Sequence, residues 1–167
     1  METARIIELG RATAFGLAAA AAGAVVWAEI AVATNYEVGF IAWGIGALVG
    51  VAASRASSRG GSAVAAIAVT AALLGVLAGK YLAFVLIARN ELPAGVDVPL
   101  VSRYTFDLLN ANRDVVFGPF DLLWIGLAAV SAARFGRGAE PAIAPSALGV
   151  QQRDGDQAGV RERGQGE

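Results

Sequence analysis

The sequence of 167 residues contains neither cysteine nor histidine. The absence of cysteine excludes disulfide bonds and thiol chemistry, the absence of histidine excludes imidazole catalysis, and together they exclude the usual zinc sites. Charged residues are also scarce, at 16%, whereas hydrophobic residues make up 56% of the chain. This composition is too apolar for an ordinary soluble domain of this length, and it predicts a membrane protein.

The sequence also lacks the motifs that would indicate catalysis or a cofactor. It has no cluster of metal-ligating residues, no G-x-S-x-G turn, and no phosphate-binding glycine loop between a strand and a helix. The net charge is -1, and no basic cluster is available for contacts with nucleic-acid phosphates. We therefore expect a protein that is not an enzyme, has no cofactor or metal and does not bind nucleic acid.

Four apolar runs approach the roughly 20 residues that a helix needs to cross a bilayer. They cover residues 12–34, 38–53, 63–88 and 115–133, and the second is short. Because lipid offers no partner to a free backbone N–H or C=O, each span must be helical. The sequence therefore predicts an all-α integral membrane protein, with a four-transmembrane-helix bundle over residues 1–135. Residues 136–167 have little apolar content, which predicts a disordered cytoplasmic tail.

Basic residues predict the orientation of this bundle. In a four-span arrangement six arginines lie on the side of the termini and three on the other side, so both termini are expected in the cytoplasm. The six are Arg5, Arg11, Arg55, Arg59, Arg134 and Arg137, and the three are Arg89, Arg103 and Arg113.

A cleaved secretory signal is the alternative reading of the first span. Arg5 and Arg11 precede an apolar run, and residues 31–33 have the small-x-small form of a cleavage site. Against it, the run over residues 12–28 is longer than the roughly 7 to 15 residues of a signal core, and Glu29 would stand just before the cut. Cleavage would leave three spans in the same orientation.

The segment between the third and fourth spans, residues 89–114, is expected on the outer side. Its apolar residues fall at helical spacing with polar residues elsewhere around the turn, which predicts a short amphipathic helix. The apolar set is Val101, Tyr104, Leu108, Ala111 and Val115, and the polar set is Arg103, Asp107, Asn110 and Asp114. Such a helix either caps the bundle or forms a docking surface for a partner.

Lys80 is the single lysine of the chain, and it lies inside the third apolar run. At about 1.5 Å per residue, Lys80, Glu29 and Asp121 would lie roughly 12, 8 and 9 Å below the same outer face. A charge inside the membrane is costly, so this shared depth predicts an ion pair between Glu29 and Lys80. Alternatively, Lys80 reaches the interface beside Tyr81. Asp121 follows Pro119 closely and is interpreted as a residue of the first helical turn.

Two glycine pairs have the spacing of helix-packing motifs. Gly46 and Gly50 lie in the second run, and Gly75 and Gly79 lie in the third. Each pair places a smooth strip on one helix face, which allows two backbones to approach closely. The motifs predict a tight bundle but do not identify the helices in contact.

The second run and its preceding turn, "TNYEVGFIAWGIGALVG", resemble a segment of small, uncharacterised bacterial multi-pass membrane proteins. Their pattern is Thr-Gly-Tyr-Glu-Ile-Gly followed by an aromatic and glycine-rich helix, and Asn35 replaces the usual glycine. The matching residues are Thr34, Tyr36, Glu37, Gly39, Trp43, Gly44, Gly46 and Gly50. The resemblance implies a bacterial inner-membrane protein and carries no activity. It draws attention to the outer residues Tyr36 and Glu37, of which Glu37 is interpreted as a helix cap.

Two functions remain open from the sequence. The favoured one is a non-catalytic membrane subunit or scaffold that packs through its glycine-faced helices and presents the outer amphipathic segment to a partner. The alternative is an oligomeric ion- or proton-coupled transporter or channel that uses Glu29 and Lys80. Both readings place the chain in lipid, as a homo-oligomer or within a larger membrane complex.

Overall fold

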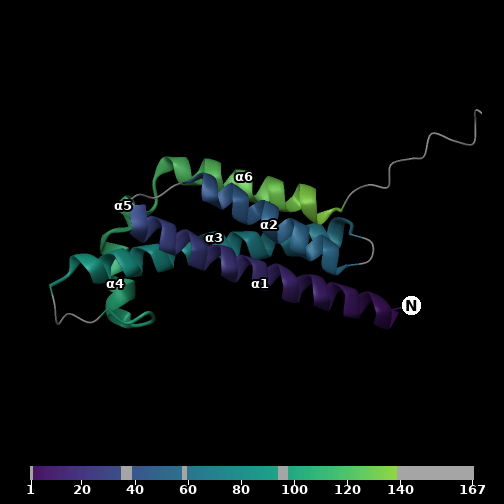
Figure 1. Cartoon of the computed structure of the whole chain (residues 1–167), viewed down its shortest axis with the longest axis horizontal. Coiled ribbons are helices and arrows are strands. Elements are labelled where there is room, and N and C mark those ends of the chain that lie inside the picture. Colours follow the sequence, from purple (N-terminus) through teal and green to yellow (C-terminus); the bar gives the residue numbers. More distant parts are fainter. Residues whose placement is uncertain (1, 35–38, 58–59, 94–97, 139–167) are drawn as a thin grey trace, which may run out of the picture.

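The structure of the protein is a computed structural model that describes residues 2–34, 39–57, 60–93 and 98–138. Within these residues, every secondary-structure element is a helix (Figure 1). The all-α fold class is therefore confirmed. The helices are α1 (Glu2–Thr34), α2 (Phe40–Ala56), α3 (Ser62–Glu91), α4 (Arg103–Ala111), α5 (Arg113–Val116) and α6 (Pro119–Gly136).

Four of these helices form a bundle. The most extensive contacts join α1 to α3 and α2 to α6, while contacts of α1 with α2, α3 with α6, and α2 with α3 complete the arrangement. α1 and α3 run in one direction, and α2 and α6 run in the other (Figure 1). One end of the bundle, called the Lys80 end, holds the end of α3 and the start of α6. The opposite end, called the arginine end, holds Arg55, Arg134 and Arg137.

Two of the helices, α1 and α3, are long and apolar enough to cross a membrane. α2 is a shorter apolar helix of 17 residues, and α6 has 18 residues. By length and composition, the described residues therefore support two candidate spans rather than the four that the sequence predicts.

The helix boundaries differ from the predicted spans at both ends of the chain. α1 begins at Glu2 instead of residue 12, because nothing in its polar first turns breaks a helix, and these turns extend beyond the bundle (Figure 1). The fourth run does not begin at residue 115. Gly118 is extended and Pro119 occupies the first turn of α6, where its fixed φ and missing N–H are tolerated. Residues 113–116 form the separate α5.

The interior of the bundle is built from small side chains. Most of its buried apolar residues are alanine, and Trp27 is the largest side chain that is almost fully buried. Large apolar side chains instead lie on the surface of all four helices. Examples are Phe15 and Val25 on α1, Trp43 and Leu48 on α2, Leu74 and Leu77 on α3, and Leu123 and Val130 on α6. This distribution lets the helices approach closely, since alanine occupies little space between them.

The two glycine pairs face different helices. Gly46 and Gly50 of α2 lie against α6, and a Cβ atom at Gly50 would stand 2.8 Å from the carbonyl oxygen of Ala132. Gly75 and Gly79 of α3 lie against α1, where a Cβ atom at Gly75 would stand 3.0 Å from the Cβ of Ala20. A side chain at Gly46, Gly50 or Gly75 would meet the backbone of the neighbouring helix, and one at Gly79 would meet the ring of Trp27.

At the arginine end, the connection between α2 and α3 meets the end of α6. Gly60 and Gly61 have positive φ values of 58° and 105°, which glycine adopts at no steric cost. The backbone N–H of Gly61 donates to the carbonyl oxygen of Arg137 at 3.1 Å. Gly136, predicted as the first residue of the disordered tail, instead ends α6 and is buried against α3. The predicted tail from residue 139 onward lies outside the described residues.

The outer segment forms α4 and α5 beside the Lys80 end (Figure 1). Its buried residues include Val98, Val116 and the polar Thr105, whose hydroxyl donates to the carbonyl oxygen of Pro99 at 2.7 Å. Val101 and Tyr104 of the predicted apolar stripe are 77% and 49% exposed, so this stripe is not the packing face. The segment is also not one helix, because the side chain of Asn112 donates to the carbonyl of Leu108 and competes with continuation of the helix.

α4 is connected to the last turns of α3 by side-chain contacts. The hydroxyl of Tyr81 donates to the carbonyl oxygen of Leu100, and the ring of Tyr81 stacks on Phe106 with centroids 5.8 Å apart. Nε of Arg89 donates to the carbonyl oxygen of Val98 at 2.6 Å. The outer segment is therefore attached beside the last turns of α3.

Candidate functional site

The buried charge of the bundle is the ammonium group of Lys80 on α3. Only 1% of this side chain is exposed, and its Nζ lies 3.0 Å from Oδ1 of Asp121 on α6. The carboxylate is 21% exposed. The ion pair therefore connects two helices that are separated by the whole outer segment in sequence.

Close packing around Gly79 brings Lys80 into the interior. Gly79 lies against the indole of Trp27 on α1, and a Cβ atom there would stand 3.1 Å from Cε3 of that ring. The Nζ of Lys80 lies 6.0 Å from the centroid of Trp27 and 5.7 Å from that of Phe117. These distances are within the range in which an aromatic ring attracts a cation. Among the described residues, the rings of Trp27 and Phe117 and the carboxylate of Asp121 lie beside the charge.

Asp121 has two roles at the start of α6. Its Oδ2 accepts a hydrogen bond of 2.7 Å from the backbone N–H of Gly118, while Oδ1 contacts Lys80. A carboxylate in the first turn also interacts favourably with the positive end of the helix dipole. The interpretation of Asp121 as a helix-start residue is confirmed by this geometry. Its second contact, with Lys80, was not predicted.

Within the described residues, the carboxylate that contacts Lys80 is that of Asp121 and not that of the predicted Glu29. Glu29 is exposed on α1, whereas its neighbours Trp27 and Ala28 belong to the buried face. Successive residues of a helix are rotated by about 100°, so Glu29 points away from the face that Trp27 and Ala28 share. The rise per residue places Glu29 near the correct depth, but its direction around α1 is wrong for a contact with Lys80.

The other predicted outer residues, Tyr36 and Glu37, lie outside the described residues. The interpretation of Glu37 as a cap of the second helix therefore remains a prediction. Trp27 and Phe117, which contact the charge, were not predicted as part of a site. Trp27 falls on the buried alanine and glycine face of α1, and this spacing is the one signal that could have placed it inward.

One polar atom beside the ion pair is unusual. In the part of the chain that the structure describes, the buried Nε1–H of Trp27 has no hydrogen-bond partner. A buried donor without an acceptor costs on the order of 1 to 3 kcal/mol. The face of α1 that meets Lys80 is therefore stabilised by packing and by the cation, and not by a hydrogen bond from the indole.

The site joins its helices through an ion pair that is also part of a helix cap. Both carboxylate oxygens of Asp121 are engaged, one by Lys80 and one by the backbone of Gly118. Among the described residues, no group of three or more acidic, histidine or cysteine side chains is placed to hold a metal ion. The arrangement therefore holds together α3, α6 and the turn at Phe117 and Gly118 that connects α5 to α6.

No protein-family model matches this chain, and no curated protein or solved structure matches it either.

Proposed function

We propose that the chain is a non-catalytic integral membrane subunit or scaffold of a bacterial inner membrane, with four transmembrane helices and both termini in the cytoplasm. The observation that carries this proposal is the inverted distribution of side-chain size, with alanine and glycine inside and large apolar residues outside. In water an apolar surface on all four helices would be costly. In lipid it is the expected surface, and close packing of small residues holds the helices together.

Helix lengths are compatible with four spans. At the standard rise, the 17 residues of α2 and the 18 residues of α6 extend about 26 and 27 Å, against a hydrocarbon core of about 30 Å. Small mismatches of this kind are accommodated by local thinning of the bilayer. α1 and α3 exceed the core thickness and would extend into the interface.

The distribution of arginine supports the orientation. Arg55, Arg134 and Arg137 share one end of the bundle, and the exposed first turns of α1, with Arg5 and Arg11, extend from the same end (Figure 1). By the positive-inside rule this end faces the cytoplasm. The bacterial inner membrane is inferred from the resemblance of residues 34–50 to bacterial multi-pass proteins.

Orientation is testable because the chain has no cysteine of its own. We expect a membrane-impermeant maleimide to label Asp107→Cys in intact cells and Ser62→Cys only after permeabilisation. Both positions are exposed, and they lie at opposite ends of the bundle. Equal labelling of the two variants in intact cells, or recovery of the protein in the soluble fraction, would contradict the topology.

Exposed apolar residues of the outer segment, of the turn that follows it and of the start of α6 support a scaffold role. Val101, Tyr104, Phe106, Phe117 and Phe120 are exposed beside the Lys80 end. We propose that they form the partner-facing surface, which would sit at the outer interface of the membrane.

A photo-crosslinking residue at Tyr104 should capture a specific protein or a second copy of the chain, whereas one at the mid-helix position Leu74 should capture lipid. A protomer that stays solitary in mild detergent, without cross-links from Tyr104, would count against the scaffold.

The alternative of an oligomeric ion- or proton-coupled transporter or channel is kept because of one observation, the charge pair inside the bundle. Intramembrane ionisable residues frequently mark ion pathways. In this chain the pair would be Lys80 with Asp121, and Glu29 would face away from it. Ion flux through reconstituted protein, lost in folded variants of either residue, would favour this alternative over the scaffold.

A further inference from the structure

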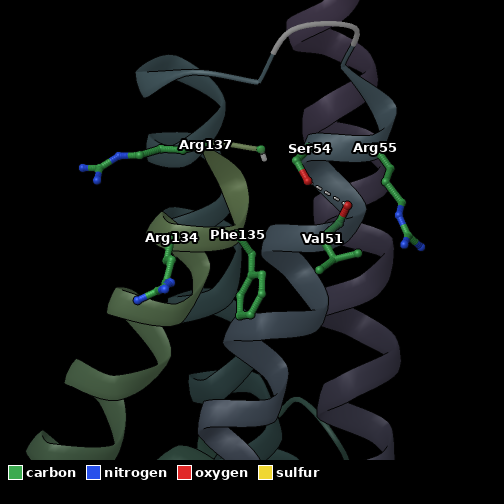
Figure 2. Close-up of a pocket in the computed structure, with 7 residues that line it drawn as sticks. Val51, Ser54, Arg55, Arg134, Phe135 and Arg137 are labelled. Carbon is green, nitrogen blue, oxygen red and sulfur yellow. Dashed lines mark hydrogen bonds between the residues drawn. The ribbon is translucent and has the colours of Figure 1, made fainter. Parts of the chain in front are cut away.

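A pocket of about 740 Å³ lies between α2 and α6 at the arginine end, far along the bundle from the Lys80 ion pair (Figure 2). Its lining comes from the last turns of both helices. The lining residues are Val51, Ser54, Arg55, Arg134, Phe135, Arg137 and Gly138. We propose that this pocket binds the phosphate-bearing headgroup of an anionic phospholipid.

The shape of the pocket is set by backbone contacts. Gly50 brings α2 against α6, since a Cβ atom there would stand 2.8 Å from the Cβ of Phe135. Beyond α6 the chain turns at Gly138, which has a positive φ of 77°. The carbonyl oxygen of Arg137 accepts from Gly61, which holds this turn against the start of α3. The pocket is therefore part of the bundle and not a gap between independent segments.

The charged residues that line the pocket, within the part of the chain that the structure describes, are all basic. They are Arg55, Arg134 and Arg137, and all three are exposed. Among the described residues, none of these guanidinium groups is within salt-bridge distance of a carboxylate. Arg134 and Arg137 extend to one side of the pocket and Arg55 to the other, with their guanidinium groups directed outward (Figure 2). Cations on both sides of the pocket attract an anion that approaches it.

The apolar residues indicate an amphiphile rather than a free phosphate ion. Val51 and Phe135 contribute an apolar surface to the pocket. On α6, Leu127 and Val130 precede Arg134 by seven and four residues, which places all three on one face. Leu127 and Val130 are both exposed. An acyl chain lying along this face would bring its headgroup phosphate to the arginine.

The same spacing recurs on α2. Leu48 and Val51 precede Arg55 by seven and four residues, and Leu48 is 49% exposed. Basic pockets between helices at the cytoplasmic face commonly bind anionic headgroups. The inference rests on the proposed membrane placement, in which this end meets the cytoplasmic leaflet.

The test uses the full chain in an uncharged detergent, titrated with short-chain phosphatidylglycerol and followed by native mass spectrometry. Two matched double variants are compared, R55Q/R134Q at the pocket and R5Q/R11Q on the exposed first turns of α1. Each arginine near an anionic group is worth about fivefold in affinity, so we expect R55Q/R134Q to weaken binding by about 25-fold. R5Q/R11Q should bind like the unmodified chain. R55K/R134K, which keeps the charges, should restore most of the affinity.

Three results would overturn the proposal. Equal weakening by the two double variants would indicate general attraction to a basic end. Binding of phosphatidylcholine as tight as that of phosphatidylglycerol would exclude recognition of anionic charge. Displacement of the lipid by an equal concentration of glycerol phosphate would assign the pocket to a soluble phosphate. Because the assay in detergent does not depend on orientation, its failure is distinguishable from a failure of the cysteine-labelling experiment.

Discussion

Replacing Asp121 with asparagine removes the carboxylate that lies 3.0 Å from Nζ of Lys80, while it keeps an oxygen that can accept from the backbone of Gly118. The change therefore tests the ion pair and preserves the helix cap. Loss of one partner from a buried pair costs about 3 to 5 kcal/mol. We expect the lower end, about 3 kcal/mol, because Asp121 is 21% exposed and the rings of Trp27 and Phe117 remain beside the cation.

The companion variants separate charge from packing. Lys80→Met keeps the length of the side chain and removes the cation, and it should cost less than Asp121→Asn because the remaining carboxylate is partly solvated. The double variant removes both members of the pair, so its loss of stability should be smaller than the sum of the two single losses, by a coupling of about 0.5 to 3 kcal/mol. Glu29→Gln is the control. Its side chain is exposed, so its effect should stay within about 0.5 kcal/mol.

Thermal unfolding in mild detergent, followed by tryptophan fluorescence, measures these differences. By the size scaling of globular proteins, about 3 kcal/mol corresponds to a decrease in Tm of about 6 to 12 °C for a chain of this length. A decrease for Glu29→Gln as large as that for Asp121→Asn would refute the assignment of the partner. A double variant whose loss of stability equals the sum of the two single losses would show that the two residues act independently.

Two further predictions concern helix packing and the outer segment. Gly46→Ala should destabilise the bundle by about 1 to 3 kcal/mol, because the added methyl group would overpack against the α6 backbone. Gly44→Ala, which has open space around it, should be neutral or slightly stabilising. Thermal unfolding compares the two variants. Tyr81→Phe removes the hydrogen bond to Leu100 at a cost of about 1 kcal/mol, so limited proteolysis should cut the outer segment faster. Tyr104→Phe changes an exposed ring and should leave the cleavage rate unchanged. Faster cleavage of Tyr104→Phe than of Tyr81→Phe would contradict the attachment of the outer segment to α3 through Tyr81.

Local chemistry near helix ends was readable without a structure. Pro119 and Asp121 indicate a helix start, and the structure places them in the first turn of α6 with the carboxylate accepting from Gly118. The exact boundary required the structure, because the apolar run before Pro119 continues without interruption in the sequence. The extended conformation of Gly118 separates α5 from α6 and allows Phe117 to contact Lys80.

In the outer segment, the spacing of the apolar residues did not predict which residues are buried. Val101 and Tyr104 have the spacing of a packing face, yet both are exposed, and the polar Thr105 is buried instead. The hydroxyl of Thr105 is satisfied by the carbonyl of Pro99, so burial of this residue depends on a local hydrogen bond. A hydrophobicity pattern carries no information about such a bond.

The sequence by itself determined the all-α class of the protein and the common level of two of its charges along the bundle. Long apolar runs predict helices, and a constant rise per residue places Lys80 and Asp121 at a common level. Only the tertiary structure decided which carboxylate meets Lys80 and which helices the glycine pairs join. The reason is that these helices are apolar around most of their circumference, so no periodicity distinguishes their faces. Direction around each axis is set by the close packing of alanine and glycine, which turns Glu29 outward and Asp121 toward Lys80.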